Sequence, residues 1–162
     1  SLCDWSSDVC SSDLARLQKT MTPGELDQLD PGFRDVGREG SEIHLNQYLD
    51  AVSERELAGT KLNTFFDNYD LLLTPTLPIT AFDAGTEVPT GSGMDRWTRW
   101  TPFSYPFNLG RHPAASIPCG LCSNGLPAGL QIVGPMNCDG HVLAASAAYE
   151  ATNPIRMPSL ED

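Results

Sequence analysis

The run Tyr69-Asp70-Leu71-Leu72-Leu73 restricts the fold of this chain more than any other feature. It is short, almost continuously apolar, and it stops at Pro75. Such a run is typical of a strand buried on both faces, as in a parallel or mixed sheet that helices cover. The run therefore predicts an α/β fold in which a mixed β-sheet is flanked by helices.

Helical patterns precede this strand. Residues 41–66 predict a helix that begins at Ser41, because serine is a favoured N-cap residue. Apolar side chains in its first half roughly follow one face: Ile43, Leu45, Tyr48, Leu49 and Val52. Residues 15–40 are polar and are interrupted by Pro23-Gly24 and Pro31-Gly32, which predicts short helical turns joined by loops.

A hairpin and a final helix are expected after the strand. Residues 115–119 and 129–133 predict two strands, and Ser123-Asn124-Gly125 lies between them. Asn-Gly tolerates the positive φ of a tight hairpin turn, so this segment marks the turn. A helix capped by Asp139 is predicted to end near Asn153-Pro154. The order of helix, strand, loop, hairpin and helix indicates α/β architecture again.

The first fourteen residues differ in character from the rest. They repeat Ser-Ser-Asp, carry three acidic residues and no base, and lack the apolar middle of a signal peptide. Residues 3–14 resemble the conceptual translation of a sequencing adapter. Residues 1–14 are therefore expected to be a non-native tail, and a disordered native tail is the alternative.

Charge and hydropathy limit the classes of partner. The formal net charge is -11, which argues against nucleic acid and anionic membranes because both require a basic face. No apolar run approaches the roughly 20 residues that span a bilayer, so no transmembrane segment is predicted. Outside the tail the cysteines are Cys119, Cys122 and Cys138, an odd number without an export signal. Reduced thiols in a cytoplasm are the expected state.

Three stretches resemble the C-terminal part of amidase signature family hydrolases. The first is 65–78 and contains Leu71-Leu72-Leu73-Thr74-Pro75-Thr76. The second is 101–120 and contains Tyr105-Pro106-Phe107-Asn108-Leu109. The third is 125–135 and contains Gly129-Leu130-Gln131-Ile132-Val133-Gly134-Pro135. The resemblance covers nearly everything after Ser41.

The resemblance implies an α/β enzyme that hydrolyses carboxamide C–N bonds in small molecules through Ser, Ser and Lys, without a metal or organic cofactor. A serine attacks an amide only with a base to take its proton, and a lysine serves as that base when its pKa is lowered. Lys19 and Lys61 are not followed by a Gly/Ser-rich loop with paired serines, so no catalytic residue is assigned. The expected organisation is a tail at 1–14, a partly helical lead-in at 15–40, and an incomplete C-terminal portion of an amidase domain at 41–162.

Candidate substrate-binding residues follow the predicted strand. Thr74, Pro75 and Thr76 lie at its carboxyl end, where ligands bind in open α/β sheets. The alternative is that the prolines merely stop the strand. Trp100 and Phe103 are candidates for an apolar pocket, with ordinary core packing as the alternative. Asn108 either binds a carbonyl group or caps a turn.

One segment departs from the family pattern. Family members commonly have Asn-Leu-Thr, two further residues and then Pro, whereas Gly110-Arg111-His112 occupies this place here. The change removes a threonine hydroxyl and adds a cation. A substrate contact inferred by analogy at this position is therefore in doubt.

Two other functions stay open. One is the amidase subunit of a tRNA-dependent amidotransferase. The other is a zinc-ribbon-like binding module, because Cys119 and Cys122, and Cys138 and His141, have the spacings of zinc ligands. Against zinc, the residues between the two pairs match the amidase pattern, which needs no metal. The sequence predicts no particular oligomeric state.

Overall fold

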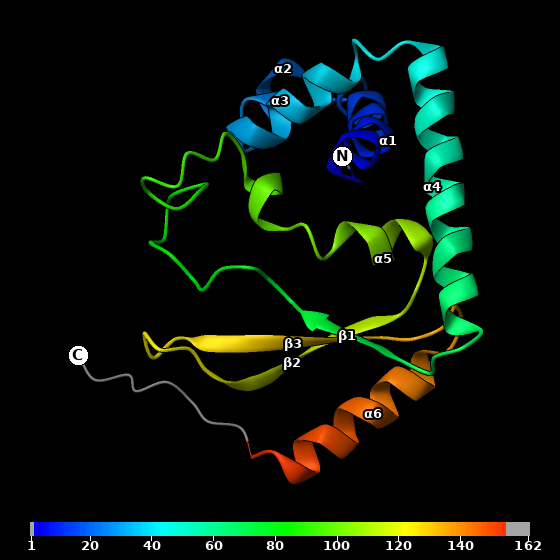
Figure 1. The fold of residues 1–162 in the computed structure, drawn as a ribbon. Coiled ribbons are helices and arrows are strands. Elements are labelled where there is room, and N and C mark those ends of the chain that lie inside the picture. The colour runs from blue at the N-terminus through cyan, green and yellow to red at the C-terminus, as the bar shows by residue number, and fades with distance from the viewer. Residues whose placement is uncertain (1, 155–162) are drawn as a thin grey trace. The chain divides into compact units, whose positions relative to one another are not determined.

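The computed structural model describes residues 2–154, and of residues 2–9 only the backbone (Figure 1). The chain divides into two compact units, Ser1–Ala58 and Gly59–Asp162. Helix α4, Leu45–Phe66, begins in the first unit and ends in the second.

The first unit is helical. It contains α1 (Leu2–Gln18), α2 (Pro23–Leu26) and α3 (Pro31–Gly40). Asp30 caps α3, because its Oδ1 accepts a hydrogen bond of 3.1 Å from the backbone N–H of Phe33. Helices α1 and α3 pack together closely, and Gly40 lies so near the Ser11 backbone that no side chain fits between them. The predicted helical turns at 15–40 are confirmed.

Ser41 does not begin a helix, so that prediction is wrong. Its hydroxyl donates to the Arg38 carbonyl at 2.6 Å, and its backbone N–H also bonds into the last turn of α3. Ser41 therefore closes α3, and α4 begins four residues later at Leu45. Leu45 is 70% exposed and Leu49 is 50% exposed, whereas Ile43, Tyr48 and Val52 are half-buried. The predicted apolar face is therefore only partly buried.

The second unit contains a three-stranded sheet of order β1-β3-β2. The strands are β1 (Leu72–Pro75), β2 (Ala114–Leu121) and β3 (Pro127–Val133), and both pairings are antiparallel. Helix α6 (Asp139–Thr152) covers one side of the sheet, and α5 (Tyr105–Gly110) lies on the other (Figure 1). Ile117, Ile132 and Val142 form the buried core between the sheet and α6.

The α/β class and a sheet flanked by helices are confirmed. Strand β1, however, is not buried on both faces. It begins at Leu72, pairs with β3 alone among the described residues, and alternates between half-buried and exposed positions. Leu73 is 58% exposed and Tyr69, outside the strand, is also 58% exposed. The apolar run forms an edge strand of an antiparallel sheet, and length and composition alone do not distinguish these cases.

The hairpin is confirmed. Gly125 has φ of +80°, and the Leu126 N–H donates to Asn124 Oδ1 at 3.2 Å, which closes the turn. The register shifts between Pro118 and Gly120, so β2 has a β-bulge there. The extra residue of this bulge is Cys119.

The final helix ends as expected, with Asn153 as its C-cap. Its N-cap is Cys138, and Asp139 is the first helical residue. The loop predicted at 74–103 is largely confirmed. Between Pro75 and α5 the described chain has one short 3-10 helix, η1 (Trp97–Trp100).

Candidate functional site

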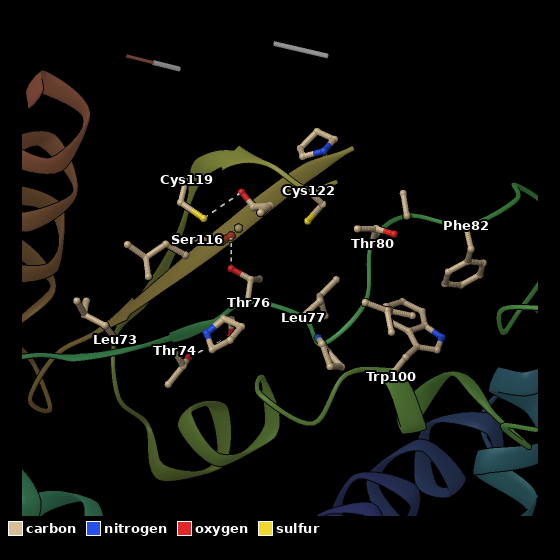
Figure 2. Close-up of a pocket in the computed structure, with 18 residues that line it drawn as sticks. Leu73, Thr74, Thr76, Leu77, Thr80, Phe82, Trp100, Ser116, Cys119 and Cys122 are labelled. Atoms are coloured by element: carbon tan, nitrogen blue, oxygen red, sulfur yellow. Dashed lines mark hydrogen bonds between the residues drawn. The ribbon is translucent and has the colours of Figure 1, made fainter. Parts of the chain in front are cut away.

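A groove of about 970 Å³ lies where the chain leaves β1 and runs past the end of the β2–β3 hairpin (Figure 2). Residues 73–82 form one wall. The hairpin contributes Ser116, Cys119, Cys122 and residues 127–130, and Trp100 completes the lining. The groove is therefore assembled from three segments that are far apart in the sequence.

Two hydroxyl groups meet on the hairpin side of the groove. Thr76 Oγ1 and Ser116 Oγ are 2.7 Å apart, and the backbone N–H of Thr76 donates to the Gly129 carbonyl at 2.9 Å. A Cβ atom on Gly129 would lie 2.7 Å from Thr76 Oγ1 and 3.1 Å from Ser116 Oγ. The missing side chain of Gly129 thus lets hydroxyls from the two outer strand segments meet across the central strand.

A buried glutamine fixes the strand beside this hydroxyl pair. Gln131 is 6% exposed and is in register with Thr74 on one side and Ser116 on the other. Its Nε2 donates to Thr74 Oγ1 at 2.9 Å and to the Phe103 carbonyl at 3.0 Å. Because both donors of the buried amide are used, Gln131 ties β1 and the loop before α5 to the central strand.

The far wall is aromatic. Phe82 and Trp100 meet edge to face with ring centroids 5.6 Å apart. The indole N–H of Trp100 donates to the Glu87 carbonyl at 3.0 Å, which fixes the ring. Asn124 Nδ2 donates to Thr80 Oγ1 at 3.1 Å and so connects the hairpin turn to this wall.

The lining suits a neutral ligand. No Asp, Glu, Lys, Arg or His side chain is among the described residues that line the groove. Ser116 Oγ is hydrogen-bonded to the hydroxyl of Thr76. A neutral hydroxyl is too weak a base to take the proton of Ser116. The groove has hydrogen-bonding groups and apolar walls for binding, but no side chain in its described lining is an Asp, Glu, Lys or His that could activate Ser116 as a nucleophile.

The structure brings four of the six predicted site residues together, since Thr74, Pro75, Thr76 and Trp100 all line the groove. Phe103 is not among the described residues that line the groove. Its carbonyl accepts the hydrogen bond from Gln131. Asn108 lies exposed on α5, outside the described lining. The assignment of these residues to substrate binding remains a prediction.

Sequence reasoning missed Ser116, Gln131 and Phe82. The first two are polar residues within otherwise apolar strands, a pattern that the sequence shows. Their place on one face of the hairpin depends on the register that pairs Ser116 with Gln131, which the sequence does not give. Phe82 lies in a loop without periodicity, and nothing local links it to Trp100.

The departure at Gly110-Arg111-His112 has a structural explanation. Arg111 adopts the left-handed conformation with φ of 59° and ends α5. His112 is then buried, with Nε2 3.1 Å from Asn63 Oδ1 and its ring stacked on Phe66 at 5.3 Å. Burial lowers the pKa of His112. The segment joins α5 to the end of α4, and His112 does not line the groove.

The zinc-ribbon alternative is wrong on geometry. Cys119 and Cys122 line the groove, whereas Cys138 and His141 lie at the start of α6. Across the part of the chain that the structure describes, no three His, Cys, Asp or Glu side chains gather as metal ligands would. The two pairs with zinc-ligand spacing therefore belong to separate elements, the end of the hairpin and the start of α6.

None of the helices in the described part of the chain is long and apolar enough to span a membrane.

A protein-family model described as Amidase matches residues 14–143. Among curated relatives, a glutamyl-tRNA(Gln) amidotransferase subunit of Brevibacillus brevis is 42% identical over 105 residues, which is 65% of this chain and 21% of that protein. The same subunit of Synechococcus elongatus is 36% identical over 115 residues, or 70% of this chain and 23% of that protein. The chain thus spans about a fifth of the length of the curated relatives it matches.

Solved structures agree with this match. A crystal structure of an amidase superposes with a TM-score of 0.82 and 28% identity. The match covers 94% of this chain and 36% of the amidase chain. A bacterial aryl acylamidase of the amidase signature family superposes with a TM-score of 0.69 and 30% identity. The match covers 90% of this chain and 31% of the acylamidase chain.

Proposed function

Because the chain belongs to the amidase family, we propose that its groove holds the substrate of an enzyme that hydrolyses carboxamide C–N bonds. The observation that carries the proposal is the hydroxyl pair Thr76–Ser116 in a groove whose described lining has no charged side chain. A carboxamide is neutral, and it both donates and accepts hydrogen bonds. It matches such a lining better than a charged ligand does, because an unpaired charge is costly to remove from water.

The proposed binding mode follows from the two walls. Within the hydroxyl pair one O–H donates to the other oxygen, so the second O–H is left to donate to a carbonyl oxygen of the substrate. The edge-to-face pair Phe82–Trp100 then contacts an apolar group attached to the amide. We infer that this group is aryl, and the aryl acylamidase among the similar structures supports this choice.

No catalytic step is assigned to these 162 residues. The Ser-Ser-Lys mechanism implied by the family resemblance needs a lysine beside a Gly/Ser-rich loop, and this sequence has no such arrangement. We propose that this mechanism acts in an enzyme in which the segment is joined to those residues. We also propose a cytoplasmic location, which rests on the reduced thiols expected from the cysteine count.

The amidase subunit of a tRNA-dependent amidotransferase is the second candidate. It is favoured by the 42% identity to the Brevibacillus brevis protein, whose name describes an amidotransferase subunit. An aryl amide occupying the groove distinguishes the two candidates. The glutamyl group in the name of that protein has no ring, so it cannot make the ring–ring contact that an aryl group would make with Phe82 and Trp100.

The test uses an enzyme that carries this segment together with the family's Ser-Ser-Lys residues. We expect hydrolysis of an N-aryl acetamide, and Thr76→Val and Ser116→Ala should each raise KM more than they lower kcat. Hydrolysis of glutamine but not of the aryl amide would favour the amidotransferase subunit. The 162-residue chain alone is expected to give no turnover, and measurable turnover by the pure chain would contradict the proposed division of roles.

A further inference from the structure

The groove contains two thiols that the proposed function does not use. Cys119 is exposed and Cys122 is half-buried, both are free, and both line the groove. Figure 2 shows both sulfur atoms on the hairpin side, with Cys119 next to Ser116. We propose that these groove thiols are a covalent modification site for neutral, apolar electrophiles, which the groove holds beside them.

The β-bulge places the first of these thiols. Pro118 pairs with Gly129 and Gly120 pairs with Ala128, so Cys119 is the extra residue between two paired positions. A bulge turns its extra side chain away from the regular alternation of the strand. The thiol of Cys119 donates to the Ala128 carbonyl at 3.4 Å, a weak bond that a reacting sulfur gives up at little cost.

The second thiol lies at the point where the hairpin turn begins. The backbone N–H of Cys122 donates to the Leu126 carbonyl at 2.8 Å, which fixes the residue at the end of the groove. Across the groove lie Leu77 and the ring pair Phe82–Trp100. An apolar reagent therefore binds in the groove before it reacts, which raises its rate of reaction with the groove thiols. A thiol without such a wall reacts only when a reagent collides with it from solution.

The chemistry needs no oxidant and releases nothing. The thiol first releases its proton to water, and the thiolate sulfur then forms a bond to one alkene carbon of an electrophile such as a maleimide. The π electron pair moves to the neighbouring carbon, which takes a proton from water. The net reaction adds S–H across the double bond. It occurs at cysteine sulfur and is independent of amide hydrolysis, so its test does not depend on the proposed function.

The test compares N-phenylmaleimide with N-ethylmaleimide on the full chain. Both reagents are neutral and differ in the ring. Rates of adduct formation are measured by peptide mass spectrometry at the groove thiols and at Cys10 and Cys138, which do not line the groove. Burial and the Asp13 carboxylate raise the pKa of the Cys10 thiol, but this slows both reagents equally and cancels in the phenyl-to-ethyl ratio.

We expect a phenyl-to-ethyl ratio at the groove thiols that exceeds the ratio at Cys10 and Cys138 by roughly two- to tenfold, the range that aromatic contacts contribute. Trp100→Ala should remove this excess. The matched variant Trp97→Ala should retain it, because Trp97 is 37% exposed and lies outside the described lining. Thermal melting of both variants shows whether they fold.

Equal ratios at Cys10, Cys119, Cys122 and Cys138 of the unaltered chain would overturn the proposal, whatever the variants do. An excess that survives in folded Trp100→Ala would also overturn it, because the preference would then not come from the aromatic wall. If Trp100→Ala does not fold, Phe82→Ala removes the other ring of the same pair and is judged by the same criterion.

Discussion

Thr76 Oγ1 and Ser116 Oγ lie 2.7 Å apart although 40 residues separate them in the sequence. Between them passes the central strand, and Gly129 is the residue at the crossing point. The backbone of Gly129 holds Thr76 in place through a hydrogen bond of 2.9 Å. A single glycine therefore determines whether the two sides of the groove share a hydroxyl pair.

The first prediction is that Gly129→Ala separates the hydroxyl pair. The new Cβ would lie 2.7 Å from Thr76 Oγ1, so the Thr76 side chain must turn away. We expect a loss of about 1–3 kcal/mol in the free energy of unfolding, as for overpacking of a filled site. Urea denaturation measures it. Gly140→Ala is the matched control, since nothing lies within 4 Å of a Cβ there, and it should be neutral or slightly stabilising.

The second prediction concerns the buried amide of Gln131. Gln131→Leu keeps the size of the side chain but removes the donors to Thr74 Oγ1 and the Phe103 carbonyl. We expect a loss of about 1–3 kcal/mol, because the part-buried Phe103 carbonyl loses its partner. Gln28→Leu, at an exposed position in a turn, controls for the substitution itself. Equal melting temperatures for the two variants would show that the amide does not tie the loop to the sheet.

How far the sequence predicts the structure depends on the range of each interaction. The hairpin was predictable because Asn124 and Gly125 form their turn locally, with the Asn124 side chain bonding two residues ahead. The edge position of β1 was not predictable, because it depends on which strands pair. An apolar residue such as Leu72 is equally common in central strands, so its identity does not reveal the position of the strand. The groove lies between these cases. Its Thr74–Thr76 wall was expected from the end of the strand, whereas its partner Ser116 required the register of the sheet.

The third prediction separates the two roles of the hydroxyl pair. Thr76→Val replaces the hydroxyl by a methyl group and leaves the bond from the Thr76 backbone N–H to Gly129 available. We therefore expect a change of at most about 1 kcal/mol in unfolding free energy, as for one part-exposed hydrogen bond. Binding of an N-aryl acetamide, followed by NMR shifts of the groove residues, should weaken by roughly two- to tenfold. Unchanged binding would leave the hydroxyl pair with a structural role only. Thr64→Val, on the exposed side of α4, is the control.

The fourth prediction is a pH dependence that comes from His112. Burial lowers its pKa in the folded chain below the ordinary value of 6.5, so the folded state binds the proton more weakly than the unfolded state does. The stability that the neutral ring provides is fully present above pH 6.5 and is lost as the pH falls below it towards the folded pKa. Denaturation curves measured at pH values on both sides of 6.5 should show this loss.

His112→Phe is the variant that isolates this effect. It retains the ring that stacks on Phe66 and removes the titrating group, together with the bond to Asn63. We expect the variant to be less stable than the unaltered chain at neutral pH, by about 1 kcal/mol for the lost hydrogen bond. The difference should shrink as the pH falls below 6.5, because only the unaltered chain then loses the contribution of a neutral histidine. A difference that stays constant with pH would show that His112 is not held neutral by its burial beside Phe66.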